Sequence, residues 1–181
     1  MPESFSLPPV TSDYEAKTSY ETARLARHKE RAGIEPFGDP LSGVVLVAES
    51  APEGAASSRI VEALRRSLAA VGLERAYVTW ARPSLLEEVL SLEPTILVAV
   101  GPAAARAIDS LGYPLAEAGF SEAPEGSWFA WTKGTFGLKL PALTPALSDD
   151  RAKRHFWKAF LALRALAAGG GLDPGPYHPR P

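Results

Sequence analysis

The stretch LLEEVLSLEPTILVAVGPAAARAI, residues 85–108, decides the fold class. Its middle part, TILVAV at 95–100, is a short, continuously apolar run, which is typical of a strand covered on both faces. Pro94 ends the preceding helical pattern. Gly101 marks a turn, and Pro102 is suited to the first position of the next helix. The order helix, buried strand, helix indicates an α/β protein.

The segments around this stretch repeat the alternation. The sequence predicts strands in VVLVA (44–48), RAYVTW (75–80) and the hairpin segment SWFAWTKGTFGLKLPAL (127–143). Helices are predicted over 57–72, 84–92 and 148–168, the last with Ser148 as its cap. We therefore expect a three-layer α/β/α sandwich with a mainly parallel four-stranded central sheet.

Three regions are expected along the 181 residues. Residues 1–42 form an arm and a mostly polar peripheral helix, running from Ser12 to a stop at Gly33. Residues 43–167 form the α/β domain, and residues 168–181 are a Gly/Pro-rich tail that builds no packed element.

Composition excludes several classes of site. The chain has no cysteine and a net charge of −2, so thiolate zinc sites and cysteine-held iron–sulfur clusters are excluded. Its three histidines are too scattered to suggest a metal site, and no cofactor is expected. No apolar run approaches a membrane span, and the first residues lack the pattern of a signal peptide, so we expect a cytoplasmic protein.

Ligands of parallel α/β sheets bind beyond the carboxyl ends of the strands. This rule selects the loops 48–54, 80–83 and 101–103, with 144–149 before the last helix as a fourth. Glu49 is the only carboxylate directly at the end of the first strand.

These segments, in this order, resemble the uracil-DNA glycosylase superfamily, above all its thermophilic bacterial and archaeal type. VVLVAESAPEG resembles the first motif, and LRRSLAAVGLERAYVTWARP resembles the helix and strand that follow it. LLEEVLSLEPTILVAVGPAAARAI is the most specific match, and LPALTPALSDDRAKRHFWKAFLAL resembles the last motif. The resemblance covers about residues 43–167 and implies a glycosylase-like fold.

The resemblance also implies site residues for hydrolysis of the bond between a deoxyribose and a damaged base. Glu49 would place or activate water, and Thr144 would donate to the departing base. The substrate would be bound by the residues at the same strand and helix ends: Ser50, Pro52, Trp80, Gly101 and Pro145.

The site departs from the family at three places. Trp80 replaces an amide that reads the base, Thr144 replaces a histidine, and no aromatic residue lies in EGAASSR where the family stacks a base. Other interpretations remain open at each position. Glu49 is either catalytic, a solvent-facing acid, or a partner for Arg82. Trp80 either stacks a base or packs in the core, and Thr144 is either a donor or a helix-entry residue.

Basic residues at the start of the last helix, with Arg82, are the candidates for contacts with DNA phosphates: Arg151, Lys153 and Arg154. The alternative for this helix is an ordinary solvated face. Three hypotheses follow for function: a divergent enzyme that excises a deaminated or damaged base from DNA, an inactive glycosylase-fold module for DNA binding or protein interaction, and a small-molecule enzyme that shares only the architecture.

Overall fold

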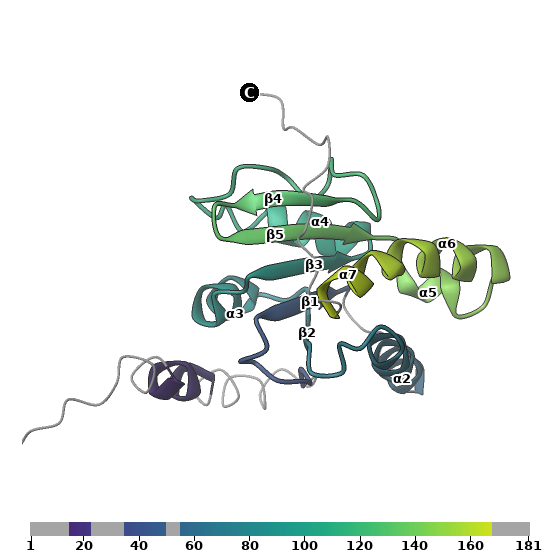
Figure 1. Cartoon of the computed structure of the whole chain (residues 1–181), viewed down its shortest axis with the longest axis horizontal. Coiled ribbons are helices and arrows are strands. Elements are labelled where there is room, and N and C mark those ends of the chain that lie inside the picture. The colour runs from purple at the N-terminus through teal and green to yellow at the C-terminus, as the bar shows by residue number, and fades with distance from the viewer. Residues whose placement is uncertain (1–14, 23–34, 50–54, 168–181) are drawn as a thin grey trace, which may run out of the picture. The chain divides into compact units, whose positions relative to one another are not determined.

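The computed structural model describes residues 15–22, 35–49 and 55–167. The chain divides into two compact units, residues 1–35 and 36–181. In the first unit, residues 15–22 are helical, as part of the helix expected there. The remainder of that helix and the expected tail at 168–181 lie outside the described residues. The second unit carries the α/β domain (Figure 1).

A five-stranded sheet in the order β2-β1-β3-β5-β4 forms the centre of the second unit. Its strands are β1 (Val44–Ala48), β2 (Tyr77–Trp80), β3 (Ile96–Val100), β4 (Trp128–Thr132) and β5 (Thr135–Leu140). The strands β2, β1, β3 and β5 run parallel, and β4 pairs antiparallel with β5 at the edge. The mainly parallel sheet is thus confirmed, but the expected count of four strands is wrong. The short turn between β4 and β5 folds β4 back as a fifth strand.

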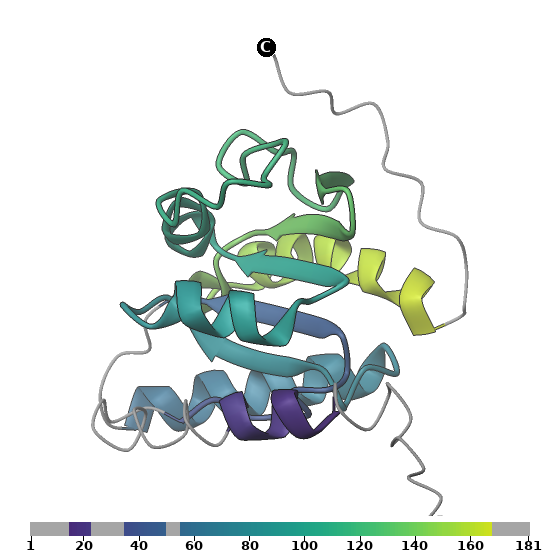
Figure 2. The same ribbon diagram turned by 90° about the vertical axis from the view of Figure 1, so that its left-hand side faces the viewer.

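Helices cover both faces of this sheet. The described helices of the unit are α2 (Ala55–Ala70), α3 (Leu85–Leu92), α4 (Pro102–Asp109), α5 (Leu143–Ala146), α6 (Asp150–Phe160), a 3₁₀ turn at Leu161–Leu163 and α7 (Arg164–Ala167). Figure 2 shows α3 and α4 in front of the sheet and α2 and α6 behind it. This arrangement is compatible with the expected three-layer sandwich.

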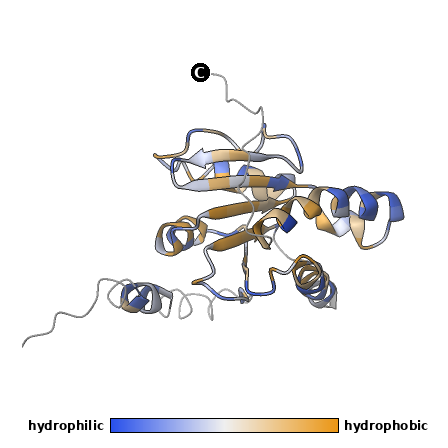
Figure 3. Ribbon diagram, viewed as in Figure 1, coloured by the Kyte–Doolittle hydropathy of each residue, from blue (hydrophilic) through white to orange (hydrophobic). Residues whose placement is uncertain are grey.

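The central strands are buried on both faces because each is covered by helices. All five residues of β3 are buried, as are four of the five in β1. Val45, Val47, Leu97 and Ala99 point toward α3 and α4, where they pack in one apolar cluster with Val89 and other helix residues. The strands appear as continuous hydrophobic segments in Figure 3, so the apolar runs in the sequence were read correctly.

The edge strand β2 is partly covered by the segment before β1. The backbone N–H of Phe37 donates to the carbonyl oxygen of Val78 at 3.1 Å, and the N–H of Val78 donates back at 2.8 Å. These two bonds tie Phe37 to the sheet, close to the start of the compact unit at Pro36. The domain boundary expected at 42/43 stays a prediction.

The last helix differs from the single helix expected over 148–168. Asp149, not Ser148, is the cap of α6, since its Oδ2 accepts a hydrogen bond from the Ala152 N–H at 2.9 Å. A 3₁₀ turn at Leu161–Leu163 then separates α6 from α7. Ser148 instead follows α5, and its N–H donates to the Pro145 carbonyl at 3.3 Å.

Gly137 on β5 leaves space for an aromatic ring from the neighbouring strand β4. It pairs with Phe129 on β4, and a Cβ placed on Gly137 would overlap the Phe129 ring. That ring is fully buried and packs edge-on against Phe120, with centroids 4.9 Å apart. The ring is therefore enclosed by packed neighbours.

We predict that Gly137→Ala lowers the free energy of unfolding by about 1–3 kcal/mol, as is usual for overpacking a dense core. The measurement is urea denaturation followed by circular dichroism. Gly134→Ala in the same hairpin is the matched control, because nothing lies within 4 Å of its Cβ position. Equal stability of the two variants would contradict the prediction.

Candidate functional site

The carboxyl ends of three neighbouring strands lie side by side. The register pairs Ala48 with Trp80 on one side and with Val100 on the other. The residues that follow, Glu49 and Gly101, therefore meet at one edge of the sheet. This is the edge that the sequence selected for ligand binding.

Glu49 is engaged with the beginning of α4. Its Oε1 accepts a hydrogen bond from the backbone N–H of Ala103 at 2.9 Å. The N-terminus of a helix carries partial positive charge and unpaired N–H groups, so a carboxylate is favoured there. Glu49 thus occupies the position at which an external anion would bind.

Gly101 provides the space for this carboxylate. Its φ of 97° lies in the region that favours glycine, and a Cβ at this position would overlap the Glu49 carboxylate. The N–H of Gly101 donates to the Leu140 carbonyl at 3.0 Å. The turn is therefore fixed by β5 from one side and by Glu49 from the other.

Trp80 lies in the core. Its side chain is 2% exposed and is among the largest fully buried ones. The indole N–H has no hydrogen-bond partner in the part of the chain that the structure describes. This burial favours the packing interpretation of Trp80 over an exposed surface on which a base stacks.

Thr144 and Pro145 are both exposed on the short helix α5, which packs beside α6. The Thr144 carbonyl accepts from the Leu147 N–H at 3.2 Å, which agrees with a helix-entry role. The role of Thr144 as a hydrogen-bond donor stays a prediction. Ser50 and Pro52, the two substrate-binding candidates in the loop after β1, lie outside the described residues.

A buried charged cluster adjoins the end of β2, and the sequence analysis missed its central residue. The side chain of Glu88 on α3 is 1% exposed, and its Oε1 lies 2.7 Å from Nη2 of Arg82 and accepts from Arg82 Nε at 2.9 Å. Ser84 Oγ donates to the same oxygen at 3.1 Å, and Thr79 Oγ1 donates to Oε2 at 2.6 Å. Glu88 thereby holds the guanidinium of Arg82. The Arg82 side chain is only 11% exposed. Its role as a DNA contact stays a prediction, but this carboxylate already binds its guanidinium.

A signal for Glu88 is present in the sequence. The buried stripe of α3 consists of Leu85, Val89 and Leu92, and Glu88 falls on it three residues after Leu85. A carboxylate on an apolar stripe is almost never fully buried without a partner. The side chain of Tyr77 lies on the same face of β2 as that of Thr79, and its hydroxyl oxygen lies 3.5 Å from Glu88 Oε2. Burial, and secondarily the negative charge of Glu88, raises the pKa of Tyr77, so the phenol stays neutral across the physiological range.

The basic residues of α6 are exposed, as the DNA-contact hypothesis requires. Arg151, Lys153, Arg154 and Lys158 are all exposed, and Figure 3 shows hydrophilic residues along α6. In the described ranges none of these four has an ion-pair partner. His155 differs, because its Nε2 lies 2.7 Å from Oε2 of Glu125. The opposite side of α6 buries Phe156 and Phe160 against the sheet.

The described residues contain no group of three or more histidine, aspartate or glutamate side chains placed to hold a metal ion. Within the same ranges no helix is long and apolar enough to cross a membrane. No known protein-family model matches the chain, and no curated protein sequence matches it either.

We predict that Glu88→Gln lowers the free energy of unfolding by about 3 kcal/mol, because the mostly buried Arg82 then loses the carboxylate that compensates its charge. The matched control is Glu87→Gln, which removes the same charge one residue earlier on the exposed side of α3. Both are measured by urea denaturation. A loss below about 0.5 kcal/mol, the range of surface substitutions, would show that the cluster does not stabilise the fold.

Proposed function

We propose that this chain is a non-catalytic α/β domain, of a type resembling the glycosylase fold, that binds the phosphate backbone of DNA through α6. The observation that carries the proposal is the set of four exposed cations on α6, none of which has an ion-pair partner among the described residues. The overall charge of −2 makes this concentration of positive charge a local feature.

The spacing of the cations suits a phosphate backbone. Arg151, Arg154 and Lys158 are separated by three and four residues, so they form one stripe along the helix. At about 1.5 Å of rise per residue the stripe is about 10 Å long. One strand of DNA presents a phosphate about every 3.4 Å along the axis, so the stripe can face about three of them. Contacts of this kind favour binding without reading sequence.

The residues at the carboxyl ends of β1 and β2 support the non-catalytic part of the proposal. Glu49, the candidate for water activation, already accepts the Ala103 N–H. Trp80, at the position of the family's base-reading amide, is buried. An indole has one donor and no acceptor, so it cannot make the paired hydrogen bonds of an amide.

Excision of a deaminated or damaged base is the second candidate function. It is favoured by the register of β1, β2 and β3, which brings the ends of the three candidate strands to one edge of the sheet. Glu49 would have to exchange its bond to Ala103 for a bond to water before it could act.

For DNA binding, we predict that the logarithm of the association constant falls with the logarithm of salt concentration with a slope of about −3, for three phosphate contacts. Replacing Arg151, Arg154 and Lys158 together by Ala abolishes most of this binding. The measurement is fluorescence anisotropy of a labelled duplex between about 20 and 200 mM salt.

The matched control for this experiment replaces three exposed arginines elsewhere, Arg59, Arg66 and Arg106, by Ala. Both triple variants remove three positive charges, so a difference between them reports position and not net charge. Equal losses in the two variants, or none in the α6 variant, would contradict the proposed interface.

For catalysis, we predict no strand cleavage above that of Glu49→Gln when the protein is incubated with oligonucleotides that carry uracil, hypoxanthine or xanthine and then treated with alkali. The physical reason is that the Glu49 carboxylate is hydrogen-bonded to the Ala103 N–H and the Trp80 indole is buried in the core. Cleavage by the unaltered protein that disappears in Glu49→Gln would establish the second candidate and remove the non-catalytic part of the proposal.

A further inference from the structure

Trp157 on α6 differs from the other three tryptophans of the chain. Trp80, Trp128 and Trp131 are buried in the core, with at most 8% of each exposed, whereas Trp157 is only half-buried. Its ring is nearly parallel to that of the fully buried Phe160, at 13° and with the two centroids 5.7 Å apart. Phe160 thus supports the indole from the core, and part of the indole stays open to solvent.

Positive charge lies within about one helical turn of this ring. Lys153 and Arg154 precede Trp157 by four and three residues, so their side chains are its neighbours on the helix surface. Both are exposed, and neither has an ion-pair partner among the described residues. The acids at the start of α6, Asp149 and Asp150, are at least about 10 Å away from Trp157 along the axis. An aromatic ring and two cations therefore lie together on one surface of α6.

This combination matches the way in which proteins bind single strands of nucleic acid. The cations contact the phosphates, and the aromatic ring stacks on the face of a base. In a duplex both faces of each base are covered by the neighbouring base pairs, so a base must first leave the stack, which costs free energy. Cations alone bind either form of DNA, whereas the ring of Trp157 favours an unpaired strand.

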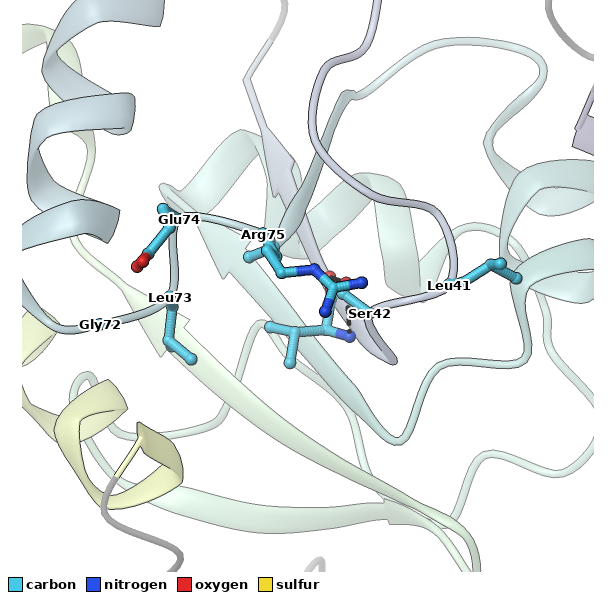
Figure 4. Close-up of a pocket in the computed structure, with 8 residues that line it drawn as sticks. Leu41, Ser42, Gly72, Leu73, Glu74 and Arg75 are labelled. Carbon is cyan, nitrogen blue, oxygen red and sulfur yellow. Dashed lines mark hydrogen bonds between the residues drawn. The ribbon is translucent and has the colours of Figure 1, made fainter.

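The hollow of about 290 Å³ beside the amino ends of β1 and β2 offers no such combination (Figure 4). Among the described residues its lining contains one cation, Arg75, and no aromatic side chain. The Arg75 guanidinium already pairs with Asp39, and Glu74 adds a further carboxylate to the lining. A polyanion is not favoured there, so the surface around Trp157 is the better site for a DNA strand.

We propose that the ligand of α6 is single-stranded DNA, with one base stacked on Trp157 and the adjacent phosphates bound by Lys153 and Arg154. This inference rests on the proposed function, since it names the form of DNA that the same helix binds. Every base has a π face on which an indole can stack, so little sequence preference is expected.

The test is a titration of the full chain, read by fluorescence anisotropy, with a labelled oligothymidine and with the duplex that it forms with its complement. We expect the single strand to bind about 10-fold more tightly, in the range that one stacked base provides. Trp157→Leu keeps an apolar side chain over Phe160 but removes the ring. It should weaken single-strand binding about 10-fold and duplex binding far less.

A second variant separates stacking from loss of packing. Trp157→Phe keeps an aromatic ring and should retain most of the single-strand affinity. The single strand should quench the tryptophan fluorescence of the unaltered protein, and this quenching should disappear in Trp157→Phe, because the other three tryptophans are buried. Circular dichroism verifies that each variant is folded. If Trp157→Leu does not fold, quenching that persists in Trp157→Phe, or is absent from the unaltered protein, overturns the inference.

The matched control is Tyr113→Leu. Tyr113 is also half-buried and stacked on a buried ring, that of Trp131 at 4.9 Å, but its loop at 110–118 carries no basic residue. This variant should bind both forms of DNA as the unaltered protein does. A single strand bound no better than the duplex, or equal weakening of both by Trp157→Leu, would overturn the inference and leave the DNA interface of α6 standing. Absence of binding to either form would overturn both.

Discussion

The parallel pairing of β1 with β3 is the interaction on which the rest of the structure depends. It places two fully apolar strands in the middle of the sheet, where each needs helices on both faces to be shielded from water. The same pairing brings the ends of the strands to one edge, so Glu49 and Gly101 become neighbours although they are 52 positions apart in the sequence. The position of the candidate site is thus a consequence of the register between β1 and β3.

Two carboxylates among the described residues near this edge are used by the protein itself. Glu49 accepts from the first turn of α4, and Glu88 compensates the charge of Arg82 beneath α3. Each arrangement satisfies a group that would be costly to leave buried or unpaired. The consequence is that Glu49 and Glu88 are both engaged within the fold, while four exposed cations without an ion-pair partner among the described residues lie on α6. That contrast is why the proposed function relies on α6.

Sequence patterns predicted the strands and helices well wherever one apolar run, or one glycine or proline at a helix end, gave a clear signal. The strands β1, β2 and β3 were read from continuous apolar runs, and α4 from its glycine and proline. Ser148 was read as the last cap because it precedes the acids, yet Asp149 has the extended backbone that a cap needs. The strand pattern placed Glu49 directly after β1 and Trp80 at the end of β2, but it left the environments of both side chains open.

The sequence by itself determined the α/β class, the parallel centre of the sheet and the edge where a site can form, because hydrophobic periodicity and strand–helix alternation are local properties of the chain. Only the tertiary structure decided which side chains are free to act. Glu49, Trp80 and Arg82 look alike as polar or aromatic residues after strands, but one caps a helix, one fills the core and one pairs with Glu88. These differences depend on contacts between segments distant in sequence, which no local pattern encodes.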